Sequence, residues 1–172
     1  DDDGGTDIGA SWILDTDTDG TINGWKKINA ASIEEIHLLD PNDHFSKAEV
    51  IGDLDNDGYE DLAITAWKDD DGGTDRGAVW IVFLNEDRTV KSYQKISDTQ
   101  GNFTGTLNDE DHFGTSVALI GDIDGDEVND LAVGAWGDDD DINNSGAVWI
   151  LFMNTDGTVK AHQKISATEG GL

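Results

Sequence analysis

The sequence predicts an all-β protein made of antiparallel four-stranded blades of the β-propeller type, about two and a half of them in 172 residues. Three observations predict this fold: a repeat with a period of 68 to 69 residues, short apolar runs bounded by glycine and aspartate, and a scarcity of helix signals. A fixed long period indicates that each copy is one supersecondary unit that buries its face against its neighbours. Four antiparallel strands in a copy of this length describe a propeller blade.

Three kinds of segment recur in register and define the repeat. Asp-His-Phe at residues 43–45 returns at 111–113. Gly-Ala-Val-Trp-Ile at residues 77–81 returns at 146–150 and, in weaker form, at 9–13. A Lys-Ile pair closes each copy, at residues 27–28, 95–96 and 164–165. This register predicts half a blade at residues 1–30 and two full blades at residues 43–98 and 111–167.

The strands of a blade are clearest in the last copy. Short, continuously apolar runs at residues 116–120, 131–136 and 146–153 are typical of strands covered on both faces. Residues 154–157 predict a hairpin turn, and residues 158–165 alternate as an outer, half-exposed strand does. The half blade has the third and fourth strands alone, which we expect at residues 8–14 and 20–28.

Two loops carry aspartates at positions 1, 3, 5 and 9 of one shared pattern. These residues are Asp53, Asp55, Asp57 and Asp61 in the first loop and Asp122, Asp124, Asp126 and Asp130 in the second. Calcium takes about six to eight oxygen ligands, and alternate residues of a tight turn can aim carboxylates at one point. Four carboxylates so close repel one another unless a cation lies among them. The sequence therefore predicts at least two Ca²⁺ per chain. An EF-hand is excluded, because its bidentate Glu is replaced by Ile64 and Val133.

The chain is strongly acidic, with 38 acidic residues and a net charge of −28. This charge excludes nucleic acid as a natural partner and disfavours anionic membranes. Metal binding and adaptation to high salt both explain such acidity. Aspartate outnumbers glutamate by 30 to 8 and gathers in the same loop of every repeat, which favours metal binding.

Two further groups of aspartates are weaker candidates for metal binding. One group consists of solvated acidic runs that could hold additional ions, with Asp69, Asp70 and Asp71 in one blade and Asp138, Asp139 and Asp140 in the other. The other group is Asp15, Asp17 and Asp19. This second group aligns with the hairpin turns at residues 85–89 and 154–158, so a plain hairpin is the favoured interpretation.

These segments resemble a known family. Phe113-Gly114, the loop from Asp122 to Asp130 and the Leu-Ala-Val-Gly-Ala run at residues 131–135 resemble the FG-GAP repeat of integrin α-subunit propellers and of many bacterial surface proteins. The resemblance covers nearly the whole chain and implies a β-propeller-like FG-GAP repeat array with calcium in the loop between the first two strands of a blade. It further implies the carbonyl groups of Tyr59 and Val128 as ligands.

The chain departs from the family pattern at several positions. Ser46 replaces the glycine after phenylalanine, and Trp67 and Trp136 stand where the family has proline. Glu127 stands where the first loop has Gly58. If the backbone has positive φ there, a side chain costs on the order of 1 kcal/mol, which would weaken the second site.

The remaining histidines and tryptophans recur in register, which indicates packing. His44 and His112 precede the repeated phenylalanine, and His162 aligns with aromatic residues of other outer strands. Trp12, Trp80 and Trp149 are expected in the core between blades. No Ser/His/Asp or Cys/His set emerges, and no carboxylate lies alone in an apolar run, so we expect no enzyme activity.

Three functions remain open. The first is a calcium-binding extracellular structural protein whose copies assemble head to tail into rings, filaments or tubes, because an open half blade exposes unpaired backbone that invites strand addition. The second is a fragment of a larger calcium-stabilised cell-surface adhesin that binds a protein or a glycan. The third is an accessory domain of a secreted enzyme. Loops with weak calcium affinity are filled where calcium is millimolar, so we expect an extracellular or cell-surface location. The chain has no apolar span long enough to cross a membrane.

Overall fold

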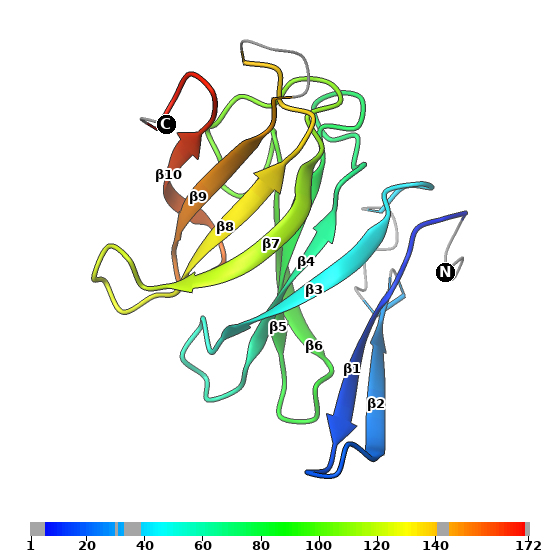
Figure 1. The fold of residues 1–172 in the computed structure, drawn as a ribbon. Helices are drawn as coiled ribbons and strands as arrows, with labels where there is room; N and C mark the ends of the chain where they lie inside the picture. The colour runs from blue at the N-terminus through cyan, green and yellow to red at the C-terminus, as the bar shows by residue number, and fades with distance from the viewer. Residues whose placement is uncertain (1–5, 30, 33–38, 141–144, 171–172) are drawn as a thin grey trace.

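The structure is a computed structural model that describes residues 6–29, 31–32, 39–140 and 145–170 (Figure 1). The described residues form ten strands and no helix. The strands are β1 (Ser11–Thr16), β2 (Ile22–Ile28), β3 (Phe45–Gly52), β4 (Asp61–Ala66), β5 (Ala78–Leu84), β6 (Val90–Ile96), β7 (Phe113–Gly121), β8 (Asp130–Ala135), β9 (Ala147–Met153) and β10 (Val159–Ile165). The predicted all-β fold class is confirmed, and the described part of the chain contains no helix that could span a membrane.

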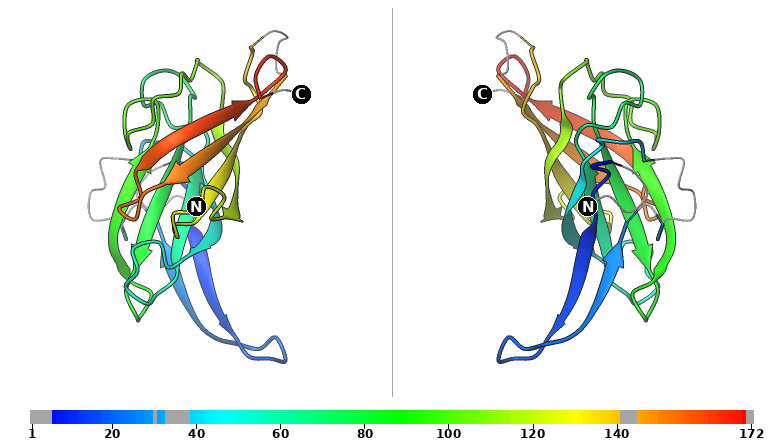
Figure 2. Two further views of the ribbon diagram at one scale, coloured as in Figure 1. Left: turned by 90° about the vertical axis from the view of Figure 1, so that its left-hand side faces the viewer. Right: turned by 90° about the vertical axis from the view of Figure 1, so that its right-hand side faces the viewer.

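The strands form three antiparallel sheets that follow one another along the chain. β1 and β2 form a two-stranded sheet, and β3 to β6 and β7 to β10 each form a four-stranded meander (Figure 1). The β1–β2 hairpin projects beyond the ends of the four-stranded sheets (Figure 2). Residues 1–5 and 30 of the expected half blade lie outside the described residues. The arrangement is that of two propeller blades preceded by the outer half of a third.

The two blades repeat each other in register. Ala63 of β4 lies opposite Ile81 of β5, and Ala132 of β8 lies opposite Ile150 of β9. These pairs are related by the same 69-residue shift that relates the sequence motifs. The repeat in sequence is therefore a repeat in hydrogen-bonded structure.

Two apolar layers hold the three sheets together. One layer contains Ile8 and Ile28 from the half blade with Phe45 and Trp80 from the first full blade. The other layer lies between the two full blades and contains residues of β4 and β5 that face Leu131, Val133 and Trp149. Burial of apolar area of this kind contributes roughly 25 cal/mol per Å² to folding. Each blade therefore depends on a neighbour for its core, as the repeat predicts.

The two inner strands of the first full blade are covered on both faces, whereas the inner strands of the last blade are less completely covered. All residues of β4 and β5 are buried. In β9 the burial alternates, and Val148 is 40% exposed where its counterpart Val79 is fully buried. The expectation of two covered faces is thus wrong for β9 and also for residues 116–120 of β7, which are exposed or half-buried. β10 is partly exposed along its length, as expected of an outer, half-exposed strand.

The three equivalent tryptophans differ in how far they are exposed. Trp80 and Trp149 are buried between sheets, as predicted. The core position predicted for Trp12 is wrong: Trp12 is 50% exposed, because it belongs to neither of the two apolar layers. Each tryptophan still has the same local partners, namely an aromatic ring on the adjacent strand and a lysine ammonium within 5.4 Å of its ring centroid.

Candidate metal centres

The first aspartate-rich loop joins β3 to β4 and the second joins β7 to β8. Each loop is held to its sheet by its last aspartate, which is fully buried. Asp61 accepts hydrogen bonds from the backbone N–H groups of Leu54 and Leu84, at 2.9 and 3.1 Å. Asp130 accepts the equivalent bonds in the second blade, at 3.0 and 3.1 Å. Burial raises the pKa of Asp61, so a nearby cation would stabilise its ionised form. Position 9 of the pattern therefore fixes the loop to the third strand of its blade.

Three carboxylates converge in each loop. Their oxygens lie within 4.8 Å of one another, in the groups Asp53, Asp55, Asp61 and Asp122, Asp124, Asp130. One oxygen of Asp55 is buried without a hydrogen-bond partner among the described residues. A buried, unpartnered carboxylate oxygen beside two other carboxylates is suited to a hard cation, which prefers oxygen ligands. The structure thus brings together six of the eight aspartates predicted from the spacing.

The aspartates at position 5 lie beside a lysine of the outer strand. Lys91 of β6 places its ammonium 2.6 Å from oxygens of both Asp55 and Asp57. The hydrogen bond from Lys91 is the main cause of a lowered pKa at Asp57. In the second blade Lys160 of β10 lies 2.6 Å from Asp124 and also contacts Asp126. A positive charge of the chain itself therefore borders each loop.

Sequence reasoning missed these two lysines. Lys91 and Lys160 are related by the 69-residue shift, and each is the second residue of an outer strand. Comparison of the outer strands in register would have found them. The half blade has Asn23 at the equivalent position and no such lysine.

The backbone of each loop folds around its first aspartate. Asp53 accepts hydrogen bonds from the N–H groups of Asp57 and Gly58, at 2.9 and 2.8 Å. Asp122 accepts a bond of 2.8 Å from the N–H of Glu127, which is the main cause of its lowered pKa. These bonds require a left-handed residue, with φ of 97° at Gly58 and 71° at Glu127. The positive φ considered for Glu127 is confirmed. The ligand roles of the Tyr59 and Val128 carbonyl groups stay predictions.

The acidic runs differ from the solvated runs that the sequence suggested. Asp69 and Asp138 are buried, and each forms an ion pair of 2.7 Å with a buried lysine, Lys95 or Lys164. The same lysines reach Asp71 at 2.9 Å and Asp140 at 2.6 Å. Desolvation makes an unpaired buried carboxylate costly, so Lys95 and Lys164 supply the counter-charge that Asp69 and Asp138 need inside the fold. Asp70 and Asp139 are exposed. Additional ions at these runs stay a prediction.

The group Asp15, Asp17 and Asp19 lies in the β1–β2 hairpin, as the favoured interpretation held. The turn is closed by a hydrogen bond from the Asp17 N–H to the Thr21 carbonyl, at 2.8 Å. The hairpin turns of the two full blades close in the same way, at 2.9 and 2.8 Å. Asp15 forms an ion pair with Arg88 of the β5–β6 turn.

The recurrent histidines pack on tryptophans. His44 stacks on Trp67 and His112 stacks on Trp136, with ring centroids 5.1 and 5.0 Å apart. His162 lies 5.1 Å from Phe103 and 5.3 Å from Trp149, and burial lowers its pKa. The packing role predicted for these histidines agrees with these contacts.

The fold and the two loops define a class of protein: an array of four-stranded propeller blades with a carboxylate cluster between the first two strands of each full blade. Residues 48–82 and 107–152 match models of the FG-GAP repeat. The chain belongs to the FG-GAP repeat family.

Curated relatives of the chain include integrin α-subunits. The chain is 30% identical over 122 residues to integrin alpha-3 of Cricetulus griseus, which covers 71% of this chain and 11% of that protein. It is 34% identical over 87 residues to integrin alpha-4 of Xenopus laevis, which covers 50% of this chain and 8% of that protein. The chain therefore spans about a tenth of the length of the curated relatives that it matches.

Proposed function

We propose that the chain is a calcium-stabilised structural module that works outside the cell, and that its blade faces join it to further blades. The observation that carries the calcium proposal is the convergence of three carboxylates in each of two equivalent loops, one of them with a buried oxygen that has no partner among the described residues. The proposed role is non-enzymatic, and calcium contributes stability rather than chemistry.

The donor set favours a hard divalent cation. All side-chain donors in the two groups are carboxylate oxygens, and soft donors are missing because the chain has no cysteine. In the first loop Asp53, Asp55 and Asp61 would hold the ion, with Asp57 and the Tyr59 carbonyl as further ligands. In the second loop Asp122, Asp124 and Asp130 would hold it, with Asp126 and the Val128 carbonyl.

Calcium binding should couple directly to folding. The carboxylates come together only in the folded chain, so an ion that binds there stabilises the native state, by about 2.7 kcal/mol per site at a free concentration of 100 times Kd. Calorimetry should find at least two Ca²⁺ per chain, and the melting temperature should fall in excess chelator. A stoichiometry below one, or a melting temperature that chelator leaves unchanged, would contradict the proposal.

A pair of variants tests whether calcium binding depends on the two aspartate clusters or only on the total negative charge of the chain. Asp124→Asn should remove one of the bound ions, because it replaces a carboxylate of the second cluster. Asp156→Asn lies in the β9–β10 hairpin, where Asp156 accepts hydrogen bonds from Thr158, and it removes the same charge outside both clusters. Equal calcium stoichiometry in the two variants would show that total charge, and not the loops, governs binding.

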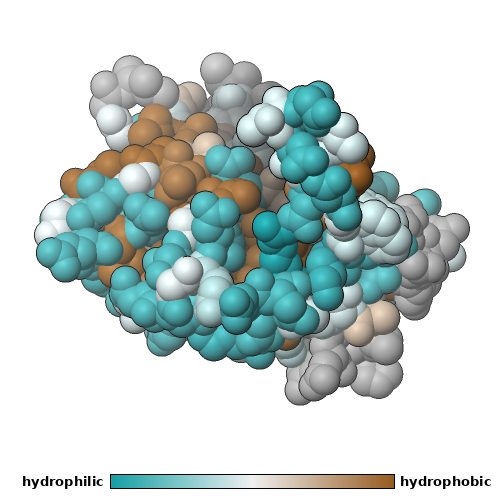
Figure 3. All heavy atoms as spheres, turned by 90° about the horizontal axis from the view of Figure 1, so that it is seen from below, coloured by the Kyte–Doolittle hydropathy of each residue, from teal (hydrophilic) through white to brown (hydrophobic). Residues whose placement is uncertain are grey.

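A second candidate function is head-to-tail self-assembly into rings or filaments. The observation that favours it is that both ends of the array present apolar faces. The half blade exposes Trp12, Leu14 and Trp25, each by at least 50%, and the last blade exposes Trp136 and Val148. The space-filling view from below shows a broad apolar area on one side, smaller apolar spots elsewhere, and hydrophilic atoms over much of the remaining visible surface (Figure 3). Contacts between unlike faces continue from copy to copy, into closed rings or open filaments.

Sedimentation and negative-stain imaging test this assembly. With a net charge of −28, copies should repel one another unless cations lie between them, so assembly should require calcium. Trp12→Glu should abolish assembly, whereas Thr21→Glu in the hairpin adds the same charge away from the apolar face. A monodisperse monomer at millimolar calcium would favour the alternative, a calcium-stabilised adhesin segment with an integrin-like propeller that binds a protein or glycan.

A further inference from the structure

At two places in the described chain, the phenylalanine that begins a blade inserts against the blade before it. We call the surface of the preceding blade that receives this phenylalanine a slot. In the first, the Phe45 N–H donates to the Ile8 carbonyl at 2.6 Å, and in the second, the Phe113 N–H donates to the Arg76 carbonyl at 2.8 Å. A glycine follows each acceptor, Gly9 or Gly77, and a Cβ atom on either would overlap the phenylalanine carbonyl. The two phenylalanine side chains are fully buried.

A second hydrogen bond recurs beside each slot. The Asn42 N–H donates to the Thr6 carbonyl at 2.9 Å, and the Glu110 N–H donates to the Thr74 carbonyl at 2.8 Å. The segment before each phenylalanine thus adds its backbone alongside the start of the preceding blade's third strand. Isolated parallel pairing of Gly9 with Phe45 describes the same geometry. The slot is therefore a defined acceptor of main chain as well as of an aromatic ring.

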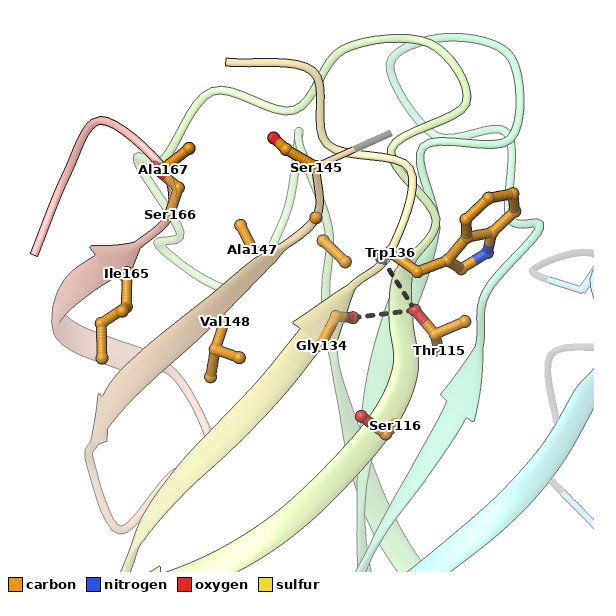
Figure 4. Close-up of a pocket in the computed structure, with 12 residues that line it drawn as sticks. Thr115, Ser116, Gly134, Trp136, Ser145, Ala147, Val148, Ile165, Ser166 and Ala167 are labelled. Carbon is orange, nitrogen blue, oxygen red and sulfur yellow. Dashed lines mark hydrogen bonds between the residues drawn. The ribbon is translucent and has the colours of Figure 1, made fainter. Parts of the chain in front are cut away.

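The last blade has the same slot, and no described residue fills it. The equivalents of Arg76 and Gly77 are Ser145 and Gly146, and no described residue donates to the Ser145 carbonyl. The nearest atom to a Cβ built on Gly146 is 3.4 Å away, in contrast to the overlaps at Gly9 and Gly77. A hollow of about 520 Å³ lies here, lined by apolar and small residues of the last blade (Figure 4).

The lining of the hollow matches the lining of the filled slot. Val148 and Ile165 line it, and their counterparts Val79 and Ile96 belong to the buried layer that contains Phe113. Val79 and Ile96 are fully buried, whereas Val148 is 40% exposed. A phenylalanine ring placed in the hollow, as Phe113 is in the filled slot, would bury Val148.

Trp136, at the rim of the hollow, also lacks a contact that its counterpart in the preceding blade has. His112 packs edge-on against Trp67 of the preceding blade, with an interplanar angle of 73° and centroids 5.0 Å apart. Trp136 has its own blade's His112 stacked on it but no described histidine edge-on, and it is 51% exposed. In an Asp-His-Phe segment, the histidine would pack edge-on against Trp136 while the phenylalanine occupies the slot.

We propose that this hollow binds an Asp-His-Phe segment of another FG-GAP blade, with its phenylalanine in the slot and its histidine against Trp136. The inference rests on the proposed function only in treating the chain as a blade that joins further blades. The occupant follows from the two filled slots, which the chain fills both times with this tripeptide. The half blade of a second copy cannot fill the slot in this way, because residues 1–30 contain neither histidine nor phenylalanine. This proposal and head-to-tail assembly are therefore alternative uses of the same face.

A synthetic peptide with the sequence of residues 107–115 is the probe. The chain has no cysteine, so Ala167→Cys at the rim gives a single attachment point for a peptide that carries one cysteine. The tether raises the effective peptide concentration to the millimolar range and overcomes the cost of ordering a short peptide. Amide NMR spectra should shift at Gly146, Ala147 and Val148 and at the Trp136 indole. The same peptide with alanine in place of phenylalanine should leave these signals unmoved.

Matched glycine variants test the main-chain contact. Gly146→Ala should abolish the shifts, because its methyl group would occupy the place of the phenylalanine carbonyl. Gly20→Ala shares the strain of a positive φ, 85° against 73°, in open space at the β1–β2 turn, and should retain them. Val148→Gln, on an exposed position, should weaken binding without affecting the fold.

Three results would overturn the proposal: no shifts in the tethered complex, equal shifts with the alanine peptide, or shifts that map to Trp12 and Trp25. The last result would assign docking to the half blade instead. Calcium calorimetry on the same sample keeps the two proposals separate, since none of the slot residues is a proposed calcium ligand.

Discussion

The ammonium group of Lys91 lies 2.6 Å from a carboxylate oxygen of Asp55, inside the cluster that we propose binds calcium. Lys160 has the same relationship to Asp124 in the second blade. The carboxylates of Asp55 and Asp57 hold the ammonium and raise the pKa of Lys91, so it stays charged at physiological pH. In each loop, therefore, a lysine ammonium contacts carboxylates that belong to the proposed calcium site.

We expect Lys91→Met to raise the calcium affinity of the first loop several-fold and to destabilise the chain in chelator. Both effects have one cause. Without a metal ion, the lysine ammonium offsets the repulsion between the carboxylates, and with a metal ion bound, the ammonium repels the ion. Lys26→Met removes a comparably exposed charge that lies beside Asp87 and should change neither quantity. Calorimetry with calcium, and melting in chelator, measure the two effects. Unchanged affinity in Lys91→Met would show that the lysine does not compete.

Gly77→Ala should destabilise the chain far more than Gly20→Ala. Both residues have nearly the same positive φ, 86° and 85°, so the backbone strain of the two variants is matched. A methyl group on Gly77 would overlap the Phe113 carbonyl, whereas Gly20 has open space. Overpacking of this kind costs typically about 1–3 kcal/mol beyond the shared strain. Urea unfolding of the two variants measures the difference, and equal losses would mean that the blades are not held at this contact.

The repeat made the architecture predictable from the sequence. Strand order, hairpin positions and the two aspartate loops follow from motifs that return at a fixed spacing, because each copy repeats one local solution. The spacing also brought Asp53, Asp55 and Asp61 together correctly, since all three lie within one loop. Local sequence thus determined most of the candidate site.

What the sequence did not reveal depends on contacts across the blade. Lys91 reaches a loop more than 30 residues away, and Lys95 converts an acidic run into a buried ion pair. Neither contact has a signal in a single copy of the motif. The one-sided burial of β9 depends on which surface lies next to it, which no local pattern specifies.

Glu127→Gly should stabilise the chain by about 1 kcal/mol, because it removes the cost of a side chain at φ 71° in the second loop. Glu49→Gly provides the control, since Glu49 lies within β3 and glycine weakens a strand. Thermal unfolding in saturating calcium should show opposite signs for the two variants. A loss of stability in Glu127→Gly would mean that the glutamate side chain contributes more than its backbone costs.

Lys95→Met should cost about 3–5 kcal/mol, the range for removing one partner of a buried ion pair. Lys95 and Asp69 are 4% and 2% exposed, so the variant leaves a buried carboxylate without its counter-charge. Lys47→Met is the matched substitution at an exposed lysine of β3, whose ammonium group donates to the Thr115 carbonyl and forms no ion pair with a described residue. Urea unfolding compares them. Similar small losses would indicate that Asp69 takes up a proton or a metal ion instead.

Two buried carboxyl groups, Asp43 and Asp111, should make the chain less stable as pH rises from about 4 to about 8. Burial, followed by the nearby Asp69, raises the pKa of Asp43 to about 8, and burial raises the pKa of Asp111 to about 6. An unfolded aspartate has a pKa of about 3.9, so between these values the folded chain binds more protons than the unfolded chain. These two groups therefore make the free energy of unfolding decrease with pH across the window, and of the two only Asp43 still contributes above about 6.

Asp43→Asn isolates this contribution. The amide can still accept the hydrogen bond that Asp43 receives from the Asp40 N–H at 2.7 Å, but it does not titrate. Urea unfolding at constant calcium from pH 5 to 8 should give a flatter profile above pH 6 in Asp43→Asn than in the parent chain, while Asp111→Asn should flatten the profile below pH 6. Asp69, Lys95 and Asp40 also face Asp43, and all three are retained in Asp43→Asn, so the difference between the two profiles isolates Asp43 itself. A parent profile that rises with pH above 6, or identical slopes in the parent and Asp43→Asn, would show that Asp43 is ionised in the folded chain and held by a cation.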